Sequence, residues 1–229
     1  MKKLLALALF AIPPTLASAA DLPSQYPNTP PPVIATVFNW SGFYLGLMGG
    51  YGMSTREAVN DTILTNSHLT GAFVGSTLGF NYQVGQFVIG IEDDGAWSGI
   101  RKTWPVGFGS VTDQILAFGS VTARAGFAID NVLIYGKGGY AWMFNDLYAA
   151  GPGGWAWELR YHPGWAVGAG LEWAFAGTWS TKLEYMYARY LDMPYVINNN
   201  STISADVQTV KIGINYRFGC CAPAVTARY

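Results

Sequence analysis

The stretch that decides the fold is residues 207–218, which read Val-Gln-Thr-Val-Lys-Ile-Gly-Ile-Asn-Tyr-Arg-Phe. From Val210 to Phe218, apolar side chains alternate with polar ones. Successive side chains of a β-strand point to opposite faces of the sheet, so one face here carries valine, isoleucine and aromatic residues. The other face carries lysine, glycine, asparagine and arginine. The first face suits hydrocarbon and the second suits water.

Seven further segments alternate in the same way: residues 41–53, 71–83, a run that begins at Phe87, 117–128, 132–142, 164–175 and 179–190. Turns of two or three residues join the second segment to the third, the fourth to the fifth and the sixth to the seventh, as in β-hairpins. The remaining gaps span roughly 15 to 20 residues, which is long for loops of a compact domain. They are residues 54–70, 96–116, 145–163 and 191–206.

The segments have the length and order of a membrane-spanning sheet. About ten residues per strand, tilted by about 40°, rise close to the apolar band of an outer membrane, which is about 25 Å tall. Closure of the sheet pairs every backbone edge, as lipid demands. We therefore expect an all-β fold, an eight-stranded antiparallel up-and-down transmembrane β-barrel. The tight turns and both termini would lie in the periplasm, and the long loops outside.

Aromatic residues fall near the expected strand ends, where interfacial girdles lie in membrane proteins. Those expected on the periplasmic side are Tyr82, Phe87, Phe127, Phe175, Trp179, Tyr216 and Phe218, and those on the outer side are Tyr51, Trp142, Trp165 and Tyr187. Their placement favours a membrane band between the two sets.

The composition agrees with a surface that faces something other than water. Charged residues make up 12% of the chain and aromatic residues 15%, whereas a soluble domain carries about 25% charged residues. The formal net charge is −1. The sequence shows no basic face of the kind that binds nucleic acid.

The chain begins with the features of an export signal. Lys2 and Lys3 precede an apolar run over residues 4–12 and the small residues Ala17-Ser18-Ala19, which form an A-x-A cleavage site. The apolar run is too short to cross a membrane as a helix. We expect a signal peptide over 1–19, a proline-rich periplasmic linker over 20–40, the barrel over 41–218 and a periplasmic tail over 219–229. The tail holds Cys220 and Cys221, either as plain thiols or in a vicinal or intermolecular disulfide.

The inward face of the expected barrel collects ionisable residues. They are Glu92, Asp94, Arg124, Lys137, Glu172, Lys182, Glu184, Lys211 and Arg217. Charges withdrawn from water need partners, so we expect Glu92 or Asp94 to pair with Arg124, and Glu184 with Lys211. An eight-stranded barrel is only wide enough for its side chains to fill, which predicts a plugged lumen. Asp93 would face lipid unless a bulge or a position near the outer rim relieved it.

Several of these strands resemble those of a known family. The resemblance rests on Asn39-Trp-Ser-Gly-Phe-Tyr-Leu-Gly, on Val-Ile-Gly-Ile-Glu at 88–92, on Gly-Trp-Ala-Val-Gly-Ala-Gly-Leu-Glu at 164–172 and on Lys-Ile-Gly-Ile-Asn-Tyr-Arg-Phe at 211–218. These sequence segments are similar to those of small alphaproteobacterial outer-membrane proteins of the RopB type. The family includes the 25 and 31 kDa surface proteins of brucellae and shares the OmpA-like barrel. The resemblance covers nearly all of the mature chain.

The resemblance implies a structural and surface-exposed protein of the Gram-negative outer membrane, with no enzymatic activity and no cofactor. It also implies insertion by the barrel assembly machinery, which reads a terminal aromatic residue in this family. Phe218 matches that residue but is followed here by residues 219–229, so Tyr216 and Phe218 would act as an internal assembly signal. In some relatives an N-terminal Ala-Asp is linked to peptidoglycan, and Ala20-Asp21 matches that pattern.

Other functions remain open from the residues alone. An enzyme would use Asp61, Ser67, His68 or His162 from the expected external loops, although their spacing sets up no nucleophile and base. No His, Cys or carboxylate cluster has the spacing of a metal site. A small-solute porin, a soluble lipocalin-like binder and an adhesin or haem-binding surface protein are the further alternatives. Lipopolysaccharide is an expected partner, with its phosphates near Arg189.

Overall fold

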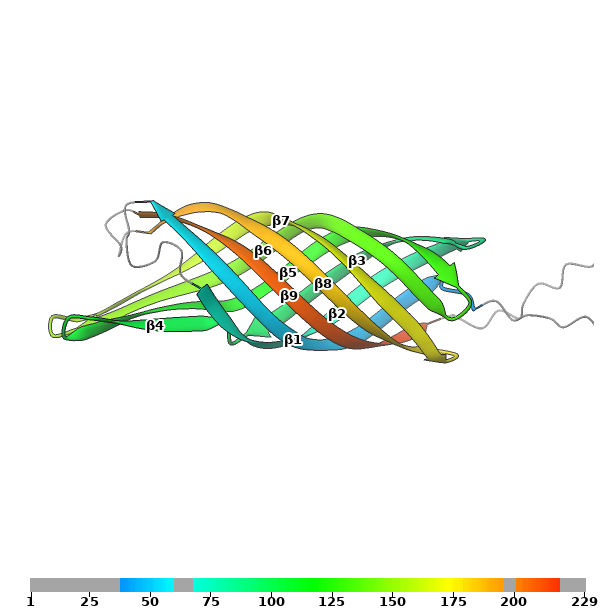
Figure 1. Ribbon diagram of the computed structural model, residues 1–229, viewed down its shortest axis with the longest axis horizontal. Helices are drawn as coiled ribbons and strands as arrows, with labels where there is room; N and C mark the ends of the chain where they lie inside the picture. Colours follow the sequence, from blue (N-terminus) through cyan, green and yellow to red (C-terminus); the bar gives the residue numbers. More distant parts are fainter. Residues whose placement is uncertain (1–37, 60–67, 196–200, 219–229) are drawn as a thin grey trace, which may run out of the picture. The chain divides into compact units, whose positions relative to one another are not determined.

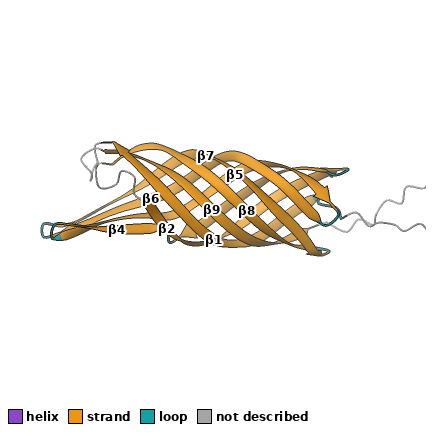
Figure 2. Ribbon diagram, in the orientation of Figure 1, coloured by secondary structure: helices purple, strands orange, loops and turns teal. Residues whose placement is uncertain are grey.

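The computed structural model describes residues 38–59, 68–195 and 201–218, and these residues form β-strands joined by short turns, without a helix (Figure 2). Accordingly, no helix in the described part of the chain is long and apolar enough to span a membrane. The strands are β1 Gly42–Val59, β2 His68–Val84, β3 Phe87–Ser98, β4 Arg101–Val106, β5 Gly109–Ile129, β6 Val132–Gly151, β7 Gly154–Ala176, β8 Trp179–Tyr195 and β9 Ser201–Phe218.

The sheet closes on itself. Its strands follow the order β1-β9-β8-β7-β6-β5-β3-β2, and β1 also pairs with β2 (Figure 1). All of these pairings are antiparallel. The short β4 follows β3 along the same side and pairs with β5, so the nine described strands make an eight-membered ring. The expected eight-stranded antiparallel barrel is confirmed.

Three tight turns lie at one rim of the barrel, at residues 85–86, 130–131 and 177–178, as the sequence predicts. Gly85 has a φ of 60° and Asp130 a φ of 51°. Such left-handed backbone is open to glycine and tolerated by aspartate, which is why these residue types stop the alternation there. The start of β1 and the end of β9 pair near the same rim, since Phe43 lies opposite Phe218.

At the other rim, the prediction of long loops was wrong over most of their length. Residues 145–163 belong to β6 and β7, which are separated only by Pro152 and Gly153, and residues 109–116 belong to β5. The β6–β7 ladder runs unbroken from Val132↔Trp173 to Gly151↔Gly154. Apolar and polar side chains continue to alternate through these segments, so the strands stay paired beyond the apolar band. Pro152 and Gly153 then make a sharp turn instead of a loop. Figure 1 shows these hairpins reaching past the rest of the ring.

Polarity is inverted relative to a soluble protein. Outward side chains are apolar and exposed, such as Leu47 at 73% and Ile212 at 62%, while the charged residues of the inward face are buried. The expected girdle residues Tyr51, Trp165, Tyr216 and Phe218 are all exposed. This arrangement requires a hydrocarbon surrounding.

Asp93 lies on the outward face, as expected, but neither expected relief is present. The β3 ladders to β2 and β5 run without a bulge, and Asp93 pairs with Leu78 on one side and Val121 on the other. It stands six residues after Phe87 and four before Trp97, well inside the apolar band. Its carboxylate therefore sits among apolar neighbours on the membrane-facing surface.

Candidate functional site

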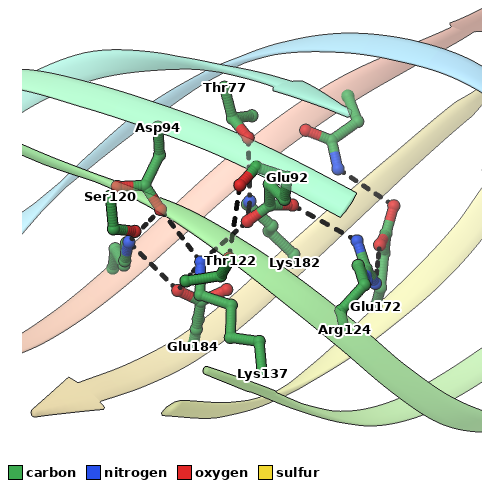
Figure 3. A network of polar contacts seen from close by, with 12 residues as sticks. Thr77, Glu92, Asp94, Ser120, Thr122, Arg124, Lys137, Glu172, Lys182 and Glu184 are labelled. Carbon is green, nitrogen blue, oxygen red and sulfur yellow. Dashed lines mark hydrogen bonds and ion pairs between the residues drawn. The ribbon is translucent and has the colours of Figure 1, made fainter. Parts of the chain in front are cut away.

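The interior of the barrel is the chemically distinctive part of the molecule. The structure places all nine ionisable residues of the expected inward face inside it, each at most 6% exposed. They come from β3, β5, β6, β7, β8 and β9, because alternate residues of each strand point inward. Figure 3 shows the network that most of them form.

Glu92 is the centre of this network. One of its carboxylate oxygens accepts from Lys137 Nζ at 2.8 Å and from Lys182 Nζ at 3.0 Å. The other accepts from Tyr44 Oη at 2.6 Å and from Arg124 Nη1 at 3.2 Å. A single carboxylate thus offsets part of the positive charge of three cations, which reach it from three different strands.

Asp94 and Glu184 form a second centre with two lysines. Lys137 Nζ lies 2.9 Å from Asp94 and 2.8 Å from Glu184. Lys211 Nζ lies 3.0 Å from each of the same two carboxylates. Tyr135 Oη donates to Glu184 at 2.8 Å. The expected Glu184 and Lys211 contact is present, within a four-membered cluster.

Glu172 completes the set on the side of the tight turns. Arg124 Nη2 donates to it at 2.9 Å, Ser180 Oγ at 2.6 Å and Asn215 Nδ2 at 2.9 Å. Arg217 Nη2 approaches within 3.5 Å. Each of the four carboxylates in this network, Glu92, Asp94, Glu172 and Glu184, therefore meets two or more cations, as burial of charge requires.

The network does not fit a metal site. Oxygens of Glu92, Asp94 and Glu184 lie within 4.8 Å of one another, as ligands of a cation would. However, Lys137 contacts all three carboxylates and Lys211 contacts two of them. The ammonium groups occupy the place and supply the charge that a cation would bring.

Below the network, toward the tight turns, an aromatic layer fills the lumen. Trp40 is fully buried and packs with Val88, Leu133 and Tyr135. The guanidinium of Arg217 lies 4.4 Å from the centroid of the Trp40 ring, a cation–π contact. The main-chain N–H of Trp40 donates to Gln83 Oε1 at 2.6 Å. Trp40 falls at the end of the expected linker, so this role was not predicted. The aromatic residue directly before the first strand was the available signal.

Above the network, an apolar layer crosses the lumen. Phe73 and Phe118 meet edge to face at 5.1 Å between ring centroids. Around them lie Met48, Leu69, Ala96, Ile100, Ile115, Ala141, Met143, Ala166, Met186, Ala188, Tyr190, Ala205 and Val207, all buried. A filled lumen was predicted from the strand number, but an apolar layer within it was not.

A second ionic site lies above this apolar layer. Arg56 Nε and Nη2 donate to the two carboxylate oxygens of Asp113 at 2.9 and 3.1 Å, a bidentate pair. Arg56 Nη2 also donates to Asn145 Oδ1 at 2.5 Å, and Asn145 Nδ2 donates to Asp113 at 2.7 Å. All three residues are at most 1% exposed. They fall in segments predicted as loops, where inward and outward faces were not distinguished, so the sequence analysis missed them.

The inward residues of β6 give the order of these layers. From the tight turn outward they are Leu133, Tyr135, Lys137, Gly139, Ala141, Met143, Asn145 and Leu147. Apolar, ionic, apolar, polar and again apolar side chains thus succeed one another along the barrel axis. Among the described residues, the lumen side chains form a stack of such layers.

The candidate catalytic residues do not assemble among the described residues. His68 is exposed on β2, with Nδ1 3.3 Å from Thr55 Oγ1. His162 is buried on β7, with Nδ1 3.2 Å from the Leu191 carbonyl oxygen. β2 and β7 stand on opposite sides of the ring. Asp61 and Ser67 lie outside the described residues.

The remaining expected residues lie at the surface or outside the described part. Tyr216 and Phe218 point outward at the end of β9 with ring centroids 5.0 Å apart, and Trp179 lies 5.1 Å from Tyr216. Arg189 forms an ion pair with Asp206 at 3.4 Å. Ala20, Asp21, Cys220 and Cys221 lie outside the described residues.

Comparison with known proteins agrees with this geometry. The model of an outer membrane protein beta-barrel domain matches residues 4–218. The 31 kDa outer-membrane immunogenic protein of Brucella melitensis is 30% identical, over 95% of this chain and 100% of that protein. The 25 kDa outer-membrane immunogenic protein of Brucella canis is 31% identical, over 88% of this chain and 91% of that protein. The outer membrane protease OmpT of Escherichia coli shares the fold at 9% identity, with a TM-score of 0.51 over 77% of this chain and 97% of OmpT.

Proposed function

The chain belongs to the family of outer membrane proteins with a β-barrel domain, and on that premise we propose that it is a closed, non-enzymatic structural barrel. In this role it supports the integrity of the Gram-negative envelope and presents its outer hairpins at the cell surface. The observation that carries the proposal is the layered lumen, in which two ionic sites alternate with apolar side chains.

A filled lumen favours a structural role over that of a porin. A passing solute would have to displace the apolar layer around Phe73 and Phe118 and also separate the ions around Glu92. Separation of a buried ion pair leaves uncompensated charge and costs several kcal/mol. Solute transport would therefore need a rearrangement of the whole interior.

The same geometry supports a non-enzymatic function. Acyl transfer or proteolysis needs a nucleophile, a base within hydrogen-bond reach and a group that orients the base. In the described part of the chain, His68 lies on β2 beside Thr55, and His162 lies on β7 beside a main-chain carbonyl. These two strands stand on opposite sides of the ring, so the two histidines do not share one site.

Surface exposure is supported by the outer hairpins and by the relatives. The tips at residues 107–108 and 152–153 lie at the rim opposite the tight turns. Two similar brucella proteins carry the word immunogenic in their names. By analogy, the tips of this chain would be accessible from outside the cell.

The expected partners of the barrel are part of the proposal. Assembly by the barrel assembly machinery would use the outward aromatic residues Tyr216 and Phe218 at the end of β9. Attachment to peptidoglycan would use Ala20 and Asp21, and muramidase digestion tests it: release of the protein only after digestion supports the linkage, and full extraction by detergent alone contradicts it. Lipopolysaccharide would surround the outer half of the barrel.

A deletion strain tests the structural role against the porin role. Two quantities are measured in the deletion strain and in the complemented strain: leakage of periplasmic enzymes with sensitivity to detergent, and the uptake rate of small hydrophilic solutes. We expect leakage and sensitivity to rise while solute uptake stays unchanged or increases. A fall in solute uptake with an intact envelope would contradict the proposal.

A further inference from the structure

The outward face of the β6–β7 hairpin stays aromatic far beyond the membrane band. Trp165 lies ten residues from Phe175, close to the span of the apolar band. Ten residues further along the same strand, Trp155 is still 67% exposed and Trp157 is 58% exposed. We call this surface the aromatic face; its residues are Phe144, Tyr148, Trp155, Trp157, Leu159 and Tyr161.

The side chains of the aromatic face form a ladder and not a scatter of single residues. Tyr148 pairs with Trp157 across the two strands, and Phe144 pairs with Tyr161. The Phe144 and Tyr161 rings are 5.4 Å apart, and Tyr161 shares a hydrogen bond with Tyr140 nearer the membrane. The face is therefore continuous with the outer aromatic girdle, a surface that already contacts lipid.

Polar residues stand on the strands to either side. On β8, Arg189 lies opposite the girdle residue Trp165 and forms an ion pair with Asp206 of β9. On β4 and β5, Thr103 and Thr112 are joined by a hydrogen bond of 2.9 Å. Exposed apolar side chains also occur singly elsewhere in the described part of the chain, as at Trp97, Phe108 and Leu191, whereas β6 and β7 carry theirs in neighbouring rows.

One carboxylate interrupts the aromatic face. Asp146 lies opposite Leu159 on the outward side of β6. Asp146 is partly exposed there and lies beside Gln114 of β5. The protein covers its Oδ1, which has no hydrogen-bond partner among the described residues. The exposed side of the carboxylate can accept a hydrogen bond from whatever covers this face.

Water, a second copy of this chain and a sugar would interact differently with the aromatic side chains and with Asp146. Water leaves an extended apolar patch exposed, which is unusual unless the patch binds something. A second copy in a two-fold contact would bury Asp146 of both chains on a face that carries no lysine or arginine. A sugar has an apolar C–H face for aromatic rings and hydroxyl groups that donate to a carboxylate. The absence of cations on the face also disfavours phosphate as the group in contact.

We propose that the aromatic face binds the saccharide of the glycolipid that forms the outer leaflet of the same membrane. The rings of Trp157 and Tyr148 stack on sugar rings, and a sugar hydroxyl donates to the exposed side of the Asp146 carboxylate. The sugars of that glycolipid lie directly above its acyl chains, which is the level of this hairpin once the apolar band is immersed. The proposal rests on the outer-membrane location and is independent of the closed lumen.

The test uses the full chain folded in detergent micelles and a core oligosaccharide released from lipopolysaccharide by mild acid, which carries no acyl chains. Binding is followed by isothermal calorimetry. We expect saturable binding by the wild-type protein. Trp157→Ala should raise the Kd at least about tenfold. Asp146→Asn should raise the Kd several-fold, because a hydrogen bond to a charged group is lost. Trp97→Ala removes an outward tryptophan on β3 that is more exposed than Trp157, and it should leave the Kd within about twofold.

Each other outcome would overturn the proposal. Wild-type protein without saturable binding, or an equal loss in the Trp97→Ala control, would remove the site. Equal affinity for an unrelated oligosaccharide such as maltoheptaose would remove the assignment to the glycolipid. A concentration-dependent dimer that Trp157→Ala dissociates would identify a second copy as the occupant. Heat-dependent electrophoretic migration verifies folding, and Trp157→Phe, which keeps an aromatic ring, should retain most of the affinity even where the alanine variant does not fold.

Discussion

At the scale of single residues, the lumen depends on carboxylates that serve several cations at once. Glu92 contacts Arg124, Lys137 and Lys182 within 3.2 Å. Removal of its charge leaves three cations with fewer partners in a buried site. Such a residue is worth more to the fold than a pairwise salt bridge at the surface.

Glu92→Gln should therefore destabilise the barrel strongly. We expect the free energy of unfolding to fall by about 3–5 kcal/mol, the range for removal of one partner from a buried ion pair. Urea unfolding of the protein in lipid vesicles, followed by tryptophan fluorescence, measures the change. A loss below about 1 kcal/mol would show that the network contributes little.

The neighbouring residue provides the opposite prediction. Asp93 points outward between Leu78 and Val121, inside the apolar band. Asp93→Leu should raise the free energy of unfolding by about 1 kcal/mol, because a carboxylate on the lipid face is unfavourable. The same urea titration checks it, and a lower stability would imply that Asp93 has a partner in the membrane. Together the two variants test the inside and outside of one strand.

The residues also show where sequence reasoning reaches its limit. Alternation within the band places Glu92, Lys137 and Lys211 on the inward face without any structure. It does not give the partners, because each ammonium reaches across the lumen to strands that are distant in the sequence: Lys211 contacts Asp94 on β3 as well as Glu184 on the adjacent β8. Arg56 and Asp113 were missed since the alternation outside the band was read as loop.

At the scale of elements, the strands are longer than the membrane requires. Turn residues at 85–86 and 130–131 mark the ends of strands correctly, because a left-handed backbone there excludes most residue types. The outer ends carry no such signal until Pro152 and Gly153, far above the band. Strand number and order were therefore predictable, whereas strand length was not.

Insertion of an epitope tests which hairpin ends face the outside. A short peptide tag between Pro152 and Gly153 should be accessible to antibody on intact cells, since this turn is the outer tip of the β6–β7 hairpin. The same tag between Gly85 and Gln86 should be accessible only after the outer membrane is permeabilised. The reverse pattern would show that the barrel is inserted in the opposite orientation.

At the scale of the whole molecule, polarity is inverted and buried side chains lie in layers along the interior. Hydrocarbon meets the side chains that a soluble protein would bury, and the ions that a soluble protein would expose lie along the axis of the barrel. The interior could be predicted to be filled, because eight strands leave room for little else. Its alternation of ionic and apolar layers depends on which inward residues share a height, and strand register fixes that only in three dimensions.

Conductance across a planar bilayer tests the closed interior most directly. The purified chain, folded and verified by heat-dependent migration, is added to the bilayer beside a known porin prepared in the same detergent, which shows that openings are detectable. A closed, layered lumen predicts insertion without discrete current steps over a range of voltages. Reproducible single-channel steps from the purified chain, absent from detergent alone, would contradict it.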